Sequence, residues 1–148
     1  MNEENKIIGG QTAEAIIPWQ VSVRLNGETG AHHYCGGVVL DEKTVLSAKH
    51  CFVGRAPADF HVMAGILNKK NDWTNSIGVE KILYANTTNQ RTFENDLAIL
   101  KLKEALAFQA NKTERACLPP SSKPFLEIDF QLCTHGVGCQ CPGTSNFY

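Results

Sequence analysis

The residues best suited to chemistry lie at positions 44–51, where a histidine stands directly before a cysteine. The first residues of this stretch form a short apolar run typical of a strand, and the next ones indicate a single tight turn that presents His50. An imidazole titrates near neutral pH, so it can accept and return a proton once its ring is held in one orientation. His50 is therefore a candidate catalytic base, with a structural histidine at the end of a strand as the alternative interpretation.

Asp96 is a second candidate, because it enters a long apolar strand at residues 95–102. A carboxylate in such a place is costly unless hydrogen bonds meet its charge. For an isolated aspartate, a cap at the start of the strand is the simpler interpretation.

Several short strands are expected to position these residues. Residues 18–25 alternate apolar and polar types and end at the turn dipeptide Asn-Gly. Residues 33–40 contain paired glycines, which indicate a close backbone approach or a bulge. Adjacent His32 and His33 would point to opposite faces of that strand, so we do not expect them to share a metal ion. Further strands are expected at residues 60–65 and 76–84.

Length and composition exclude several classes of protein. The chain has 148 residues, 43% of them hydrophobic and 20% charged, which fits one ordinary globular domain. Its formal net charge of -1 provides no basic field to attract nucleic acid or acidic lipid. The apolar runs are too short to span a bilayer. We therefore expect neither nucleic acid nor a membrane as a partner.

The cysteines predict an oxidising compartment. Six cysteines in a chain of this length are rare in the cytosol without a metal. Asn86 and Asn111 each begin an Asn-x-Thr triplet and are candidates for glycosylation, which agrees with an extracellular, secreted protein. The polar N-terminus has no apolar signal core, and we expect a leader that lies outside the given sequence.

Five motifs resemble those of the trypsin/chymotrypsin family of serine proteases, and they follow one another along the chain in the same order as in that family. The histidine motif Val-Leu-Ser-Ala-Lys-His-Cys resembles the family's Leu-Thr-Ala-Ala-His-Cys and departs from it at Lys49. The others are Ile-Ile-Gly-Gly at residues 7–10, His-Tyr-Cys-Gly-Gly at 33–37, Asp-Leu-Ala-Ile-Leu at 96–100 and Ala-Cys-Leu-Pro-Pro at 116–120. The resemblance extends to about Gly136.

The resemblance implies an all-β fold, a six-stranded antiparallel Greek-key barrel over residues 7–120. Residues 1–6 would be a propeptide-like leader. Residues 121–148 would be the truncated start of a second barrel with a divergent tail. Full-length members of the family have two barrels, with the active site in the cleft between them.

The family also implies roles for individual residues. His50 would be the base, and Asp96 would accept its second N–H, fixing the tautomer and steadying the imidazolium. Cleavage between Lys6 and Ile7 would activate a zymogen. The resemblance pairs Cys35 with Cys51, a bridge worth about 3 kcal/mol in the chain-entropy model.

The family's nucleophile is missing from these residues. Acyl transfer by this route needs a serine beside the base and backbone N–H donors for the oxyanion, which the family supplies from a Gly-Asp-Ser-Gly-Gly segment. No such segment occurs here. The serines present are Ser22 and Ser76 in expected strands, Ser121, Ser122 and Ser145 in linker or tail, and Ser47, where the family has a buried structural hydroxyl. We therefore expect that these residues alone do not hydrolyse peptides. A peptide or protein substrate is expected only if a second barrel completes the active site.

We expect this chain to be an inactive portion of a secreted endopeptidase. Two other functions are alternatives to this one. A lone barrel would expose an apolar face and could act as a binding module or decoy for a protein partner. Alternatively, Cys133, His135, Cys139 and Cys141 could bind zinc, although their spacing matches no common zinc pattern. We therefore predict no metal and no cofactor. The family pairs the positions of Cys117 and Cys133 with segments absent here, and it has no counterpart of Cys139 or Cys141.

Overall fold

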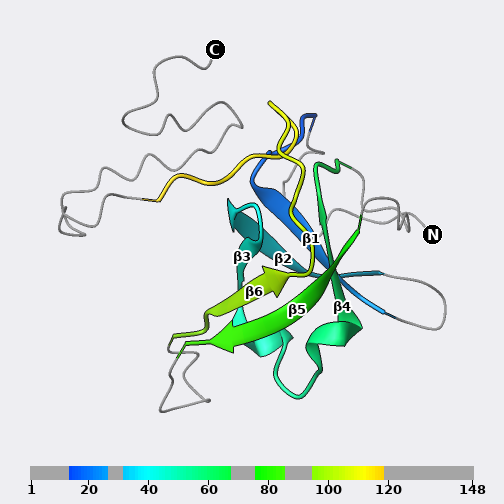
Figure 1. The fold of residues 1–148 in the computed structure, drawn as a ribbon, viewed down its shortest axis with the longest axis vertical. Helices are drawn as coiled ribbons and strands as arrows, with labels where there is room; N and C mark the ends of the chain where they lie inside the picture. Colours follow the sequence, from blue (N-terminus) through cyan, green and yellow to red (C-terminus); the bar gives the residue numbers. More distant parts are fainter. Residues whose placement is uncertain (1–13, 27–31, 68–75, 86–94, 119–148) are drawn as a thin grey trace, which may run out of the picture.

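Six antiparallel strands close into a barrel in the computed structural model, which describes residues 14–26, 32–67, 76–85 and 95–118 (Figure 1). The strands are β1 (Gln20–Leu25), β2 (His32–Asp41), β3 (Thr44–Ser47), β4 (Phe60–Ala64), β5 (Ile77–Tyr84) and β6 (Ala98–Leu102). Around the barrel their order is β1-β2-β3-β6-β5-β4. The expected all-β Greek-key barrel is thus confirmed. The proposed leader at 1–6 and the second-barrel segment at 121–148 lie outside the described residues.

Helical structure in the described residues is limited to two single turns. They are the 3-10 helices η1 (Lys49–Cys51) and η2 (Pro57–Asp59). The first is the tight turn expected after β3, and the second begins with a proline whose fixed φ suits a first helical position. Both turns lie in the connection between β3 and β4.

The core fills the barrel with side chains from alternate strand positions. On β1, Val21 and Val23 are buried inward, as a strand with a period of two residues requires. Phe52 and Phe60 are fully buried and pack edge to face, with their ring centroids 4.9 Å apart. Phe52 directly follows η1, so the turn that presents the histidine rests on the apolar core.

The two glycines of β2 have different environments. A Cβ on Gly37 would lie 2.8 Å from Val45 Cγ1 and 3.0 Å from Val21 Cγ2, whereas one on Gly36 would meet nothing within 4 Å. The expected close approach therefore occurs at Gly37. The register of β2 shifts against β1 between His33 and Cys35 and against β3 between Val39 and Asp41, so neither glycine is itself the site of a shift.

The pairing of β3 with β6 determines where the candidate residues meet. These strands are antiparallel, and Ser47 at the end of β3 pairs with Ala98 at the start of β6. The residues that follow β3 therefore lie beside those that precede β6. His50 and Asp96 occupy these two positions.

Candidate active site

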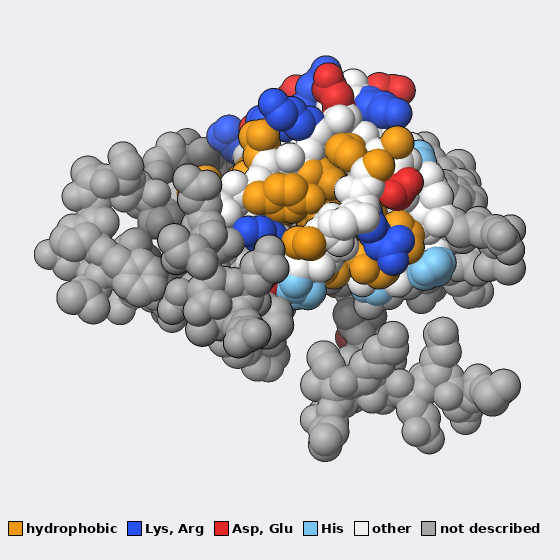
Figure 2. Space-filling view, turned by 90° about the horizontal axis from the view of Figure 1, so that it is seen from below, with side chains coloured by type: hydrophobic (Ala, Val, Ile, Leu, Met, Phe, Trp, Pro, Cys, Tyr) orange, Lys and Arg blue, Asp and Glu red, His pale blue; other side chains and the backbone are white. Residues whose placement is uncertain are grey.

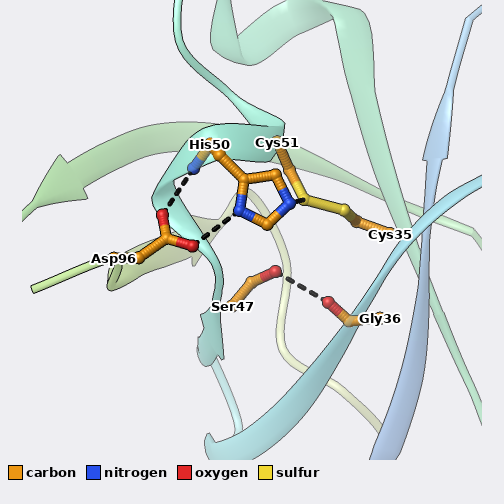
Figure 3. Close-up of a disulfide and its surroundings, with 6 residues drawn as sticks. All are labelled: Cys35, Gly36, Ser47, His50, Cys51 and Asp96. Atoms are coloured by element: carbon orange, nitrogen blue, oxygen red, sulfur yellow. Dashed lines mark hydrogen bonds and ion pairs between the residues drawn. A yellow bond between two sulfur atoms is a disulfide. The ribbon is translucent and has the colours of Figure 1, made fainter. Parts of the chain in front are cut away.

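His50 and Asp96 contact each other through side chain and backbone. The Nδ1 atom of His50 lies 2.6 Å from Asp96 Oδ2, and the backbone N–H of His50 donates to Asp96 Oδ1 at 2.8 Å (Figure 3). The backbone N–H of Lys49 donates to the carbonyl oxygen of Asp96 at 3.3 Å. The aspartate is thus bound to the first two residues of η1, and the imidazole is held in one orientation.

These contacts also fix the tautomer of the imidazole. The hydrogen bond from the His50 side chain is the main cause that holds the pKa of Asp96 below its ordinary value of 3.8; burial opposes this shift, and the His50 backbone N–H adds to it. Asp96 is therefore ionised at neutral pH and can only accept. Nδ1 must carry the shared proton, which places the lone pair of the neutral ring on Nε2, 3.6 Å from Cys51 Sγ.

The site lies at the surface. The His50 side chain is 56% exposed, and that of Asp96 is 23% exposed. A hydrogen-bonded, oriented imidazole with solvent access can take a proton from a neighbouring hydroxyl and return it later. The arrangement therefore has the geometry of a general base with its supporting carboxylate.

A disulfide fixes the histidine turn to β2. Cys35 of β2 and Cys51 of η1 are bonded, with their Cα atoms 6.5 Å apart, and Cys51 is buried. Next to this bridge the Ser47 hydroxyl donates to the Gly36 carbonyl at 2.7 Å. The turn is consequently tied on one side to β2 and on the other to the residues before β6.

The sequence leaves the pairing of Cys117 open. In the structure Cys117 is disulfide-bonded. The partner lies outside the described residues.

Lys49 makes contacts that the sequence did not predict. Its ammonium donates to the Ala85 carbonyl at 3.5 Å and lies 5.9 Å from the centroid of the Tyr84 ring. The Tyr84 hydroxyl in turn donates to the Phe52 carbonyl at 3.2 Å. The end of β5 therefore supports the histidine turn from a third side. The only sign of this in the sequence was that Lys49 departs from the family motif.

The described serines lie in structural positions. Ser22 is buried, with Oγ 2.8 Å from His33 Nδ1, and Ser47 is buried against Gly36. Ser76 is half-buried before β5. Asn111, a glycosylation candidate, is exposed at a turn and has a positive φ of 59°. The candidates that lie outside the described residues are Lys6, Ile7, Asn86, Ser121, Ser122, Cys133, His135, Cys139, Cys141 and Ser145.

Comparison with known families identifies the class. The sequence model of the family described as Trypsin matches residues 7–146. The chain belongs to the trypsin family. This agrees with the closed barrel and with the geometry of His50 and Asp96.

The individual relatives are longer than this chain. Trypsin theta of Drosophila melanogaster is 37% identical over 102 residues, which are 68% of this chain and 37% of that protein. Human transmembrane protease serine 11B is 30% identical over 132 residues, 88% of this chain and 30% of that protein. The chain thus spans about a third of the length of the curated relatives it matches. No helix in the described ranges is long and apolar enough to cross a membrane.

Two similar solved structures carry titles that describe inactivated proteases. The scabies mite inactivated protease paralogue S-D1 has a TM-score of 0.63 at 27% identity, covering 76% of this chain and 46% of its own. The paralogue S-I1 from the same source has a TM-score of 0.64 at 30% identity, covering 78% of this chain and 51% of its own.

Proposed function

We propose that this chain supplies the general base and its supporting carboxylate, His50 and Asp96, to a trypsin-like serine endopeptidase. We further propose that the 148 residues do not hydrolyse peptides by themselves. The observation behind the first statement is the 2.6 Å contact between His50 Nδ1 and Asp96 Oδ2, which holds the ring in the tautomer whose lone pair is on Nε2. The second rests on the sequence, which has no Gly-Asp-Ser-Gly-Gly segment.

The chemistry requires a serine and oxyanion donors from a second barrel. Nε2 of His50 would take the proton of that serine as its oxygen attacks the scissile carbonyl. Asp96 would keep Nδ1 protonated and stabilise the imidazolium. The imidazolium would then return the proton to the leaving amine. Peptides and proteins are the corresponding substrates.

Activation and location are part of the same proposal. Cleavage between Lys6 and Ile7 would release a new N-terminus, as the family's zymogens require. Secretion into an oxidising compartment is supported by the Cys35–Cys51 disulfide and by the bridge at Cys117.

A serine-reactive fluorophosphonate probe tests the proposal in two proteins. We expect no labelling of the 148-residue chain. A hybrid in which residues 1–118 precede the second barrel of an active trypsin should be labelled and should cleave peptide substrates. The matched His50→Ala hybrid should lose both. Labelling of the 148-residue chain that disappears in His50→Ala would contradict the proposed inactivity, and a His50→Ala hybrid with full activity would contradict the role of the base.

A non-catalytic binding module is the second candidate. Hydrophobic side chains reach the surface of the barrel in several places (Figure 2). Leu97 and Tyr84 are 51% and 43% exposed. These two lie close to Asp96, because the Ala85 N–H donates to the Leu97 carbonyl. Exposed apolar side chains near one another are consistent with a surface that binds a protein partner. A monomer on size exclusion, with unchanged partner capture in Leu97→Ser, would contradict this candidate.

A further inference from the structure

The turn η1 (Lys49–Cys51), together with Asp96 and Cys35, is called the histidine corner below. We propose that reduction of the Cys35–Cys51 disulfide converts this histidine corner into a binding site for one Zn²⁺ ion. Its ligands are the two thiolates and Nε2 of His50. The potential ligand atoms of these three residues all lie within 4.8 Å of one another. Thiolate sulfur and imidazole nitrogen are the donors that zinc prefers in proteins. This inference does not depend on the proposed proteolytic function.

Two of the three ligand atoms already lie at a separation that suits a zinc ion. Nε2 of His50 lies 3.6 Å from Cys51 Sγ and points toward it in Figure 3. Bond lengths of about 2.0–2.1 Å to nitrogen and about 2.3 Å to sulfur place tetrahedral N and S ligands about 3.5 Å apart. The Cα atoms of the two cysteines are 6.5 Å apart. This separation leaves room for the two sulfurs to move apart onto one ion once their bond is broken.

Asp96 orients the third ligand. A zinc-bound histidine usually donates its other ring N–H to a carboxylate, which fixes the tautomer and makes the ligating nitrogen more basic. The hydrogen bond from His50 Nδ1 to Asp96 Oδ2 already provides this arrangement. The nitrogen that faces the sulfurs is therefore the unprotonated one.

The exposure of the ligands defines the type of site. The His50 side chain is 56% exposed, whereas Cys51 is 3% exposed. An ion would enter from the side of His50 and meet the sulfurs beneath it. Three protein ligands leave a fourth position for water or another donor, as in open zinc sites.

Formation of the site is a balanced redox and exchange reaction. A dithiol reductant supplies two electrons and two protons, the S–S bond breaks, and the dithiol becomes a cyclic disulfide. Zn²⁺ then displaces one proton from each thiol of Cys35 and Cys51 into solvent and forms two metal–thiolate bonds. Binding should therefore tighten as the pH rises.

Metal binding would occupy the lone pair that a general base needs. While Nε2 of His50 donates to the ion, it cannot accept a proton from a hydroxyl. The oxidised corner presents a base, and the reduced, metal-bound corner presents none. One residue would thus change its chemical role with the redox state of the bridge beside it.

A Co²⁺ titration tests the site in the full chain. The four other cysteines are first replaced, giving a background variant that carries C117S, C133S, C139S and C141S. This variant is reduced with dithiothreitol, freed of the reagent without oxygen, and titrated with Co²⁺. We expect one equivalent to bind, with the visible bands of a tetrahedral ion and a thiolate-to-cobalt charge-transfer band, and Zn²⁺ should displace it. His50→Ala should weaken binding at least tenfold, and Asp96→Asn roughly ten- to a hundredfold.

Matched controls make each outcome decisive. The oxidised background variant and a background variant with C35S and C51S should give no charge-transfer band. If reduction unfolds the barrel, one equivalent of Zn²⁺ should restore its circular dichroism in the background variant but not in His50→Ala. Absence of the charge-transfer band together with absence of metal-dependent refolding would overturn the proposal. Equal affinity in His50→Ala would overturn it as well.

Discussion

The interior of the barrel and the corner that holds His50 are maintained by different forces. The interior is closed and apolar, with Val23, Phe52, Phe60 and Leu100 fully buried. The corner is partly exposed, and short hydrogen bonds between His50 and Asp96 hold it together. In the interior, stability depends on volume and packing. At the corner, function depends on the identity of single atoms.

The difference predicts how each region responds to change. A buried side chain that loses carbon atoms leaves a cavity and costs stability. An exposed hydrogen-bonded pair contributes little to folding but can control a proton. Substitutions in the interior should therefore change the free energy of unfolding, and substitutions at the corner should change the reaction rate. The opposite result in either region would contradict the distinction.

The largest expected effect belongs to the corner and concerns rate. In the active hybrid, Asp96→Asn should lower kcat about 10⁴-fold, a magnitude that belongs to the trypsin family itself. The amide NH₂ would face Nδ1 and favour the wrong tautomer of His50. Thermal unfolding should change little. Asp41→Asn in the same hybrid is the control, and a loss of less than tenfold in Asp96→Asn would remove Asp96 from the mechanism.

The next effect belongs to the interior and concerns stability. Phe52→Ala should lower the free energy of unfolding by about 3–5 kcal/mol, because the ring is fully buried against Phe60. Val53→Ala is the control next to it, since Val53 is 54% exposed, and it should change stability by less than about 0.5 kcal/mol. Chemical denaturation measures both. Similar values for the two variants would contradict the placement of Phe52 in the core.

A smaller effect should separate the two glycines of β2. Gly37→Ala places a methyl group 2.8 Å from Val45 Cγ1 and should cost about 1–3 kcal/mol. Gly36→Ala meets no atom within 4 Å and should stay within about 0.5 kcal/mol of the parent chain. Equilibrium unfolding of the pair checks this, and equal stability would mean that β2 and β3 do not approach as closely as described.

The smallest effect is a pH dependence at the corner. The pKa of Asp96 is lower in the folded chain than its ordinary value of 3.8, so the unfolded chain takes up the proton first as the pH falls. The stabilisation from the pair is therefore complete above about pH 5 and is lost as the pH falls through the folded pKa. The difference in unfolding free energy between the parent chain and Asp96→Asn should shrink as the pH falls below about 5. A difference that grows on acidification below that pH would contradict the hydrogen bond as its cause.

Much of the barrel could be predicted from local pattern. Alternation located β1, and an apolar run beside Asp96 located β6, because a strand with one buried face repeats every two residues. The meeting of His50 and Asp96 came only from the resemblance to a family. Nothing local in the sequence specifies that Ser47 pairs with Ala98, and this pairing is what brings the two residues together.

The parts that escaped prediction are contacts between distant segments. The hydrogen bond from the Lys49 ammonium to the Ala85 carbonyl depends on where β5 ends. No sequence pattern around residue 49 reveals that position. Close spacing between three ligand atoms at the corner is a property of the folded turn, because Cys35 reaches it from another strand.

The ring of strands links His50 to Asp96 along two independent routes. One route is direct, through the ladder between β3 and β6, and the other runs the opposite way through β2, β1, β4 and β5. Loosening either route leaves the other to hold the two residues in register. A change in the surface connection at residues 53–56 therefore leaves the alignment of the pair to the two routes through the sheet.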